Sequence, residues 1–300
     1  MNITIRPART NDRTALIAVE AGATPNLSYV DNVFDLFLDD KGGEFTVAEI
    51  DGKVVACGKM TILPDGSAWL ETIRVLPDCQ GHGIGKRFYQ RFIDIAHAQQ
   101  IRTLRMYTGI QNAVSKGLAE HFEFELAETF GSASLALPIS GEWDKPNKEL
   151  DKTAPTFQPV TDPAWAAKLL LGLSIEWGGF MVMNRTFYRW TPELCTALVT
   201  NGQLYADIGS ENMGSANTSS VNIVVVGARF MLENALHVGY FSGDAAACLT
   251  FAARLGSKTQ CARLSCLFPI ASTNIAQCLY DCGFSPDPAK LIVMERHLPV

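Results

Sequence analysis

Residues 80–86 read Gln-Gly-His-Gly-Ile-Gly-Lys, and they constrain the fold more than any other segment of this chain. They join a strand-like run, 68–75, to a helix-like run, 84–100. Glycines carry no Cβ, so the backbone of such a turn can approach a ligand closely. The first turn of a helix carries unpaired N–H groups and a partial positive charge. A strand, a glycine-rich turn and a helix therefore predict a site that binds a phosphate or pyrophosphate group.

Two common phosphate-binding motifs do not fit this segment. A Walker loop requires Ser or Thr after its lysine, whereas Lys86 is followed by Arg87. The dinucleotide-binding motif requires a third glycine at position 86. The remaining pattern, Gln-x-x-Gly-x-Gly, resembles the pyrophosphate loop of the GNAT superfamily of N-acetyltransferases. The preceding stretch, 71–77, is a strand ending in Val-x-Pro and is similar to the same family.

The resemblance implies acetyl-CoA as co-substrate. The loop backbone would hold its pyrophosphate, and the strand backbone would pair with its pantetheine arm. The Val75 N–H would be the oxyanion donor, and Lys86 would add positive charge near the phosphates. Asn112 and Ser115 match the Asn-x-x-Ala/Ser start of the family's next helix, which borders the pantetheine. The implied cofactor-binding residues are Ile73, Arg74, Val75, Gln80, Gly81, His82, Gly83, Ile84, Gly85, Lys86, Asn112 and Ser115.

Acetyl transfer from a thioester to an amine needs a base for the ammonium group and stabilisation of the leaving thiolate. Glu71 is the candidate base, acting directly or through a water molecule; the alternative is a structural glutamate paired with Arg74. The family's usual acid is a tyrosine, but the matching position is Ala119. Tyr107 is the nearest remaining candidate in the sequence, and its alternative is a purely structural role in a strand. A thiolate can also leave without an acid.

The order of predicted elements in the first half matches the GNAT fold. This implies an α/β (α+β) fold with a mixed, mainly antiparallel twisted sheet flanked by helices. The predicted strands are 2–6, 44–50, 53–63, 68–75, 104–108, 124–130 and 133–137, and the predicted helices are 11–20, with Asn11 as cap, 29–38, 84–100 and 113–120. We assign 1–137 to a catalytic domain, 138–159 to a polar, proline-containing linker and 160–300 to a second domain.

The second half contains a weak copy of the first. One constant offset aligns Gly81 with Gly243, Gly83 with Ala245, Gly85 with Ala247 and Asn112 with Asn274. The copy has lost the glutamine and two of the three glycines. It has gained Asp244, whose carboxylate would cap the helix and repel a phosphate. The pattern predicts a degenerate GNAT-like domain without cofactor; the alternative is a chance agreement between two α/β patterns.

Composition limits the class of protein. A hydrophobic content of 47% and a charged content of 19% indicate a globular chain. No apolar run approaches the ~18 residues that span a membrane, and the first residues do not resemble a signal peptide. The net charge of -6 argues against nucleic-acid binding. The eight cysteines form no Cys-x-x-Cys pair, so we expect reduced thiols, no metal site and a cytoplasmic location.

These features predict an acetyl-CoA-dependent N-acetyltransferase acting by direct attack of a primary amine, that of a small molecule or amino acid, on the thioester. The alternatives are a protein lysine or N-terminal acetyltransferase and a non-catalytic acyl-CoA sensor. Asp31, Asp35, Asp39 and Asp40 would attract a cationic amine or simply form a solvated acidic face. We expect a monomer or homodimer.

Overall fold

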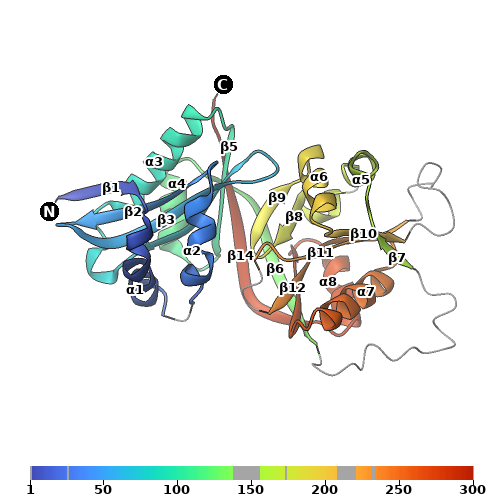
Figure 1. The fold of residues 1–300 in the computed structure, drawn as a ribbon. Helices are drawn as coiled ribbons and strands as arrows, with labels where there is room; N and C mark the ends of the chain where they lie inside the picture. Colours follow the sequence, from blue (N-terminus) through green and yellow to red (C-terminus); the bar gives the residue numbers. More distant parts are fainter. Residues whose placement is uncertain are drawn as a thin grey trace. The chain divides into compact units, whose positions relative to one another are not determined.

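The computed structural model describes residues 2–25, 27–137, 156–172, 174–207, 221–230 and 234–299. The chain divides into two compact units: Met1–Ala127 with Ile292–Val300, and Glu128–Leu291. The division predicted from the sequence placed 128–137 in the first domain and 292–300 in the second. Most of the predicted linker, 138–155, lies outside the described residues. Both units contain sheets and helices (Figure 1).

The first unit is built on a sheet in the order β1-β2-β3-β4-β5-β14. Its strands are β1 (Ile3–Pro7), β2 (Glu44–Ile50), β3 (Lys53–Ile62), β4 (Ala68–Val75), β5 (Thr103–Gly109) and the end of β14 (Ser285–His297). Strands β1 to β4 pair antiparallel, whereas β4 and β5 pair in parallel. The final strand of the chain thus lies beside β5, and its part from Ile292 onward belongs to the first unit.

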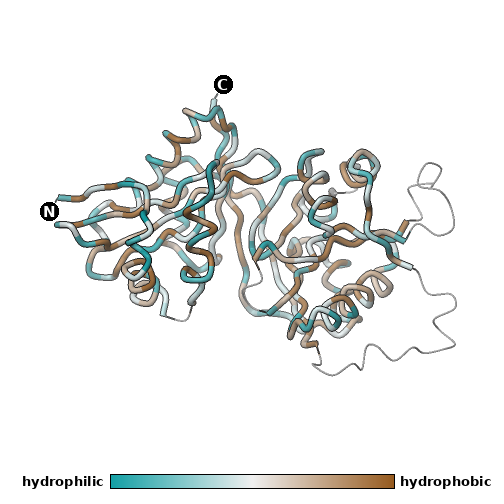
Figure 2. The backbone as a smooth tube through the Cα atoms, viewed as in Figure 1, coloured by the Kyte–Doolittle hydropathy of each residue, from teal (hydrophilic) through white to brown (hydrophobic). Residues whose placement is uncertain are grey.

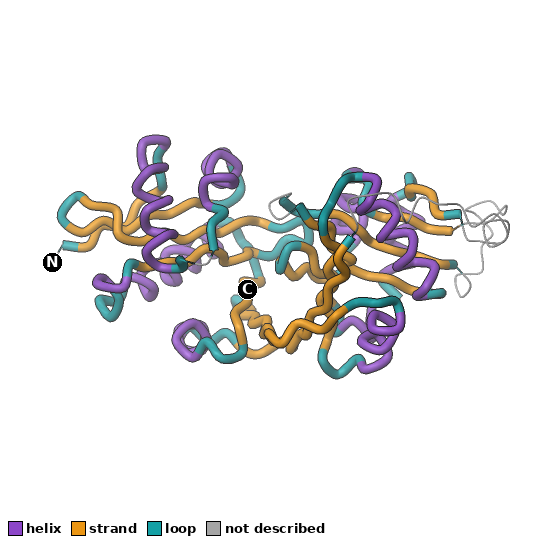
Figure 3. The backbone as a smooth tube through the Cα atoms, turned by 90° about the horizontal axis from the view of Figure 1, so that it is seen from below, coloured by secondary structure: helices purple, strands orange, loops and turns teal. Residues whose placement is uncertain are grey.

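Helices flank both faces of this sheet (Figure 3). They are α1 (Arg13–Ala23), α2 (Val30–Asp39), α3 (Ile84–Ala98) and α4 (Ala113–His121), with 3-10 turns at Thr10–Asp12 and Pro77–Cys79. A Cβ at Gly58 would meet Phe88 and Phe92 of α3, whereas the neighbouring Lys59 lies over the ring of Phe37 on α2. Because adjacent strand residues face opposite sides, α2 and α3 cover opposite faces. Hydrophobic and hydrophilic stretches alternate along α3 (Figure 2), and its hydrophobic side chains enter the core.

The second unit repeats this design. Its sheet runs in the order β6-β13-β12-β11-β10-β7, and β12 and β13 form its parallel pair. The strands are β6 (Glu125–Ala136), β7 (Phe157–Pro159), β10 (Leu204–Asp207), β11 (Asn222–Gly227), β12 (Ala235–Ser242) and β13 (Arg263–Pro269), with a separate β8–β9 hairpin (Phe180–Met183 and Thr186–Arg189). The helices are α5 (Pro163–Leu170), α6 (Pro192–Thr200), α7 (Ala245–Lys258) and α8 (Thr273–Asp281), with a 3-10 turn at Ser174–Trp177.

The predicted fold class is confirmed: both units carry mixed, mainly antiparallel sheets flanked by helices. Two local predictions were wrong. Strand β6 is continuous where two strands were predicted, because Gly131 stays in register opposite Phe268 of β13. Helix α1 begins at Arg13, with Asp12 rather than Asn11 at its N-cap position, because Thr10–Asp12 form a 3-10 turn. Among the described residues, no helix combines the length and apolar character needed to cross a bilayer.

Candidate functional site

The glycine loop before α3 leaves open space around two of its three glycines. Gly81 and Gly83 have φ of 78° and 77°, a conformation that glycine adopts without steric cost. A Cβ on either residue would meet no described heavy atom within 4 Å. A Cβ on Gly85 would instead lie 2.9 Å from Cδ2 of Leu118, so this glycine allows α3 to pack against α4. The first two glycines therefore shape the open side of the loop, and the third serves packing.

The N-terminus of α3 has no side-chain cap among the described residues. Gly83 occupies the N-cap position and offers no side-chain acceptor. The N–H groups of the first turn, at Ile84, Gly85 and Lys86, thus keep the orientation that binds anions at helix ends. The exposed Lys86 adds a positive charge beside them. Exposed His82 bends back, with Nδ1 3.3 Å from the Cys79 carbonyl oxygen.

The matching position in the second unit is filled. Asp244 caps α7 by accepting a hydrogen bond from the Ala247 N–H at 3.1 Å. The Asn222 side chain accepts from the Asp244 N–H at 2.7 Å. A Cβ on Gly243 would lie 2.4 Å from the same Asn222 oxygen, so this glycine has no open space beside it. Carboxylate and amide oxygens thus occupy the place where the first unit has free N–H groups.

Strand β4 continues beyond its pairing with β5. The parallel register ends at the pair of Leu70 and Met106, while β4 runs on to Val75 beside β3. The Leu76 N–H donates to the Val55 carbonyl on β3. Because N–H groups alternate in direction along a strand, the Val75 N–H points away from β3, toward the side where β5 has diverged. The Gln80 side chain donates to the Val75 carbonyl at 3.1 Å and so joins the loop to this strand end.

A β-bulge interrupts β4 beside this gap. Cys57 pairs with Arg74 and Lys59 pairs with Glu71, so β4 contains one extra residue between the two pairs. Thr72 lies in this interval with φ of 61°. Beyond the bulge, Ile73 turns toward α3, where it packs beside the position of Gly58.

The candidate base is partly exposed and hydrogen-bonded. Thr61 Oγ1 donates to Glu71 Oε1 at 2.8 Å, and Lys59 lies opposite Glu71 in the register. Arg74 is not its partner, because the guanidinium pairs with the buried carboxylate of Glu20. The Arg74 side chain is therefore paired with a carboxylate of α1.

Tyr107 lies on the same sheet face as Glu71. Trp69 pairs with Arg105 in the parallel register. Side chains two residues apart on a strand share a face, so Glu71 and Tyr107 lie on the same face as Trp69 and Arg105. The Tyr107 ring stacks on Trp69, with centroids 5.9 Å apart and planes 5° apart. The two predicted catalytic side chains thus come from adjacent strands at the point where these strands separate.

Helix α4 borders the loop without supplying an acid at position 119. Ala119 is fully buried. The Asn112 side chain accepts a hydrogen bond from the Ser115 N–H at 3.1 Å and so caps α4. The two residues predicted to border the pantetheine therefore bond to each other, and together they fix the start of the helix that packs against Gly85.

The acidic residues of α2 are mostly paired. Asp31 and Asp35 both bind the exposed guanidinium of Arg13, at 2.8 and 2.9 Å. Asp40 pairs with the buried Lys59 ammonium. Burial alone would raise the pKa of Asp40, but the hydrogen bond and charge of Lys59 hold it below its usual value. The pairing favours a structural role for these carboxylates over recruitment of an amine.

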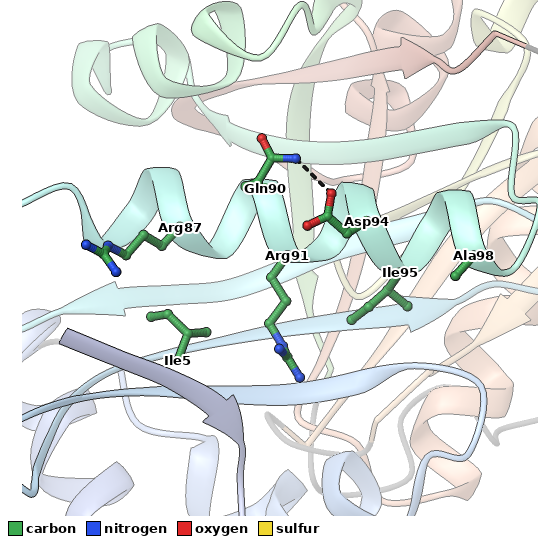
Figure 4. Close-up of a pocket in the computed structure, with 7 residues that line it drawn as sticks. All are labelled: Ile5, Arg87, Gln90, Arg91, Asp94, Ile95 and Ala98. Carbon is green, nitrogen blue, oxygen red and sulfur yellow. Dashed lines mark hydrogen bonds between the residues drawn. The ribbon is translucent and has the colours of Figure 1, made fainter.

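A shallow groove of about 420 Å³ runs along the other side of α3, next to β1 (Figure 4). Its lining residues are Ile5, Arg87, Gln90, Arg91, Asp94, Ile95 and Ala98. Its polar side chains already have partners: Gln90 donates to Asp94, Arg91 pairs with Glu44, and Arg87 donates to the Ile3 carbonyl. The groove includes none of the predicted site residues.

Residues 15–124 match the model of the acetyltransferase (GNAT) family. An amino-acid acetyltransferase of Mycobacterium tuberculosis is 30% identical over 107 residues, or 35% of this chain. The match covers 60% of that relative's length. The matched segment includes the glycine loop, β4 and β5, so the open helix end and the diverging strands lie in the part of the chain with the family's sequence.

Solved structures extend the likeness of fold to the whole chain. A GCN5-related N-acetyltransferase from Sphaerobacter thermophilus superposes with a TM-score of 0.63 and 13% identity, covering 98% of this chain and 95% of that one. One from Kribbella flavida gives a TM-score of 0.53 and 11% identity, covering 99% and 72%. The family match thus lies within residues 15–124, and the structural neighbours show a likeness of fold over the whole chain.

Proposed function

We propose that this chain is an acetyl-CoA-dependent N-acetyltransferase whose first unit binds the cofactor and transfers acetyl to a primary amine. The observation that carries the proposal is the uncapped N-terminus of α3, with open space at Gly81 and Gly83, beside the diverging end of β4. A helix end with free N–H groups is a favourable place for a pyrophosphate. Acetyl-CoA, when bound, supplies the activated acetyl group.

Residues of β4 and the loop would hold and orient the donor. The N–H groups from Gly81 to Lys86 would face the phosphates, with the Lys86 charge nearby. The backbone of Ile73 and Val75 would pair with the pantetheine arm, as an added strand pairs with a sheet edge. The Val75 N–H would donate to the thioester carbonyl oxygen as negative charge develops on it.

Proton transfer would involve the face that carries Glu71 and Tyr107. Glu71 would accept the proton of the attacking ammonium, directly or through a water molecule. Tyr107 is the candidate donor to the leaving sulfur, since α4 carries Ala119 at the position of the family's usual tyrosine. Both side chains project from strands that remain paired with their neighbours up to Leu70 and Met106, so the sheet fixes their spacing.

The second unit would be a degenerate relative that binds no cofactor. The capped α7 supports this, because Asn222 and Asp244 already accept hydrogen bonds from the N–H groups of Asp244 and Ala247 at the start of the helix. We assign the catalytic role to 1–137 and the degenerate role to 160–300, as the sequence predicts. The match to the family model ends at residue 124, which agrees with a family-like sequence in the first half only.

The acceptor is proposed to be a small molecule or an amino acid. The relative that bears the name amino-acid acetyltransferase supports this choice. A protein lysine or N-terminal acetyltransferase is the second candidate, and the absent tyrosine at position 119 keeps a non-catalytic acyl-CoA sensor as the third.

A panel of amines separates these candidates. Purified protein is mixed with acetyl-CoA and single amines, amino acids or peptides, and free thiol is measured over time. The proposed activity predicts thiol release that depends on a small amine. Faster release with peptides would favour the protein acetyltransferase. Acetyl-CoA binding by calorimetry without turnover on any acceptor would favour the sensor.

A further inference from the structure

Thr72 is held in an unusual conformation within the bulge of β4. Its φ of 61° lies in the left-handed region, where the branched side chain of threonine is rarely found. Residues persist in such conformations only when their surroundings hold them there, and they occur frequently at functional sites. The neighbours of Thr72 must therefore hold it in the bulge.

A closed set of contacts holds Thr72 from the side of α1 and α2. The Tyr29 hydroxyl lies 2.5 Å from Thr72 Oγ1. The Arg74 guanidinium lies 4.8 Å from the centroid of the Tyr29 ring and pairs with the Glu20 carboxylate. Glu20 also accepts from the N–H groups of Tyr29 and Val30, at 3.1 and 3.0 Å. Glu20 and Arg74 are both buried, so little water competes with these contacts.

The bulge decides which backbone groups of β4 face the gap beside β5. Side chains and N–H groups both alternate with a period of two along a strand. One extra residue therefore reverses the alternation beyond the bulge. With the bulge, Glu71 shares its face with Arg74, and the Val75 N–H points away from β3. Without it, the Val75 N–H would turn toward β3, where it could not reach a substrate in the gap.

We propose that Tyr29 and Thr72 are positioning residues for acetyl transfer: the hydroxyl pair fixes the bulge that aims the Val75 N–H at the thioester carbonyl. The inference rests on the proposed function, because Val75 is its proposed oxyanion donor. Glu20 and Arg74 hold the Tyr29 ring and thus act one step further away. Neither hydroxyl takes part in the chemical step.

The test uses Tyr29→Phe, which removes the hydroxyl and keeps the ring against Arg74. We expect kcat to fall on the order of tenfold, because a misaimed donor stabilises less of the developing charge. The KM for acetyl-CoA should stay near the wild-type value, since the glycine loop is unchanged. Adding Thr72→Gly should restore much of kcat, because glycine adopts positive φ without a hydrogen bond. Tyr89→Phe, at a buried tyrosine of α3, is the matched control.

Amide hydrogen exchange of 72–76, measured without ligand, provides a readout independent of turnover. It should speed up in Tyr29→Phe and return toward wild type in the double variant. If no amine is acetylated by the wild-type protein, the proposed function fails, while the exchange data still test the bulge. An unchanged kcat and unchanged exchange in Tyr29→Phe would overturn the proposal, as would a folded double variant without recovery. If Tyr29→Phe does not fold, Thr72→Ala, which removes the same hydroxyl pair from the other side, should lower kcat to a similar extent and speed up exchange of 72–76. Wild-type kcat and exchange in a folded Thr72→Ala would contradict the inference.

Discussion

Nε of Arg105 lies 2.7 Å from a carboxylate oxygen of Glu295, although the two residues are 190 positions apart in the chain. Arg105 also binds Asp65 at 2.8 Å, and its side chain is 1% exposed. The Leu298 N–H donates to the Arg102 carbonyl nearby. The end of β14 is thus an integral strand of the first unit, and its loss would leave a buried cation with one carboxylate fewer.

Arg105→Met should therefore destabilise the first unit strongly. It leaves the carboxylates of Asp65 and Glu295 in a buried position without their cation, which costs about 3–5 kcal/mol. Urea unfolding followed by fluorescence measures the loss of unfolding free energy. Arg296→Met is the control, because its pair with the 78% exposed Glu123 should contribute only about 0–1 kcal/mol. Equal effects of the two substitutions would contradict this account of β14.

The proposed binding of pyrophosphate at the glycine loop is tested by Gly83→Asn. Asparagine tolerates positive φ better than other side chains do, so the backbone should keep its conformation while the side chain enters the open space. We expect acetyl-CoA affinity to fall at least tenfold, about 1.4 kcal/mol, with the melting temperature little changed. Calorimetric titration measures the affinity.

Gly52→Asn is the matched control for this substitution. Gly52 has φ of 79° and equally open surroundings, but it lies in the hairpin turn between β2 and β3. Its replacement should leave acetyl-CoA affinity unchanged. Unaltered affinity in Gly83→Asn, or an equal loss in both variants, would refute a pyrophosphate site at the glycine loop.

The sequence predicts those parts of the site that depend on neighbouring residues. The glycine loop, β4 and α3 are contiguous, so their order and type follow from local patterns, and both the predicted strand 68–75 and the start of the predicted helix 84–100 match the structure. The break predicted near Gly131 is wrong, because pairing with β13 holds this glycine in a strand. The sequence around a glycine does not reveal that a distant strand such as β13 will pair with it.

The sequence does not predict those features of the site that depend on residues far apart in the chain. The pair of Arg74 and Glu20 spans 54 positions, and neither residue signals the other. A β-branched residue such as Thr72 gives no sign of positive φ, since threonine favours regular strands. The place of 292–300 beside β5 depends on the whole fold of the chain.

The degenerate state of the second unit predicts one acetyl-CoA per chain. Asn222 and Asp244 accept hydrogen bonds from two N–H groups at the start of α7, so a pyrophosphate would have to displace them and would meet a like charge. Calorimetry should give a stoichiometry near one for the wild-type protein. Asp244→Ala should lower stability by about 1 kcal/mol through the lost cap without adding a second site. Two sites of similar affinity in the wild-type chain would overturn the assignment.

Glu71→Gln tests the proposed base. The substitution keeps the size of the side chain and its place beside Thr61 Oγ1, but it removes the carboxylate that would accept a proton. We expect kcat to fall on the order of 10²-fold, with acetyl-CoA affinity unchanged because the glycine loop and the backbone of β4 are preserved. The acidic limb of the pH profile should also move, since it would report the group that must be deprotonated. Steady-state kinetics across pH, with the best amine of the panel, measure both effects. Glu120→Gln, at the exposed pair with Lys116 on α4, should change neither. If Glu71→Gln leaves both kcat and the acidic limb in place, Glu71 is a structural partner of Thr61 and the base lies elsewhere on this face.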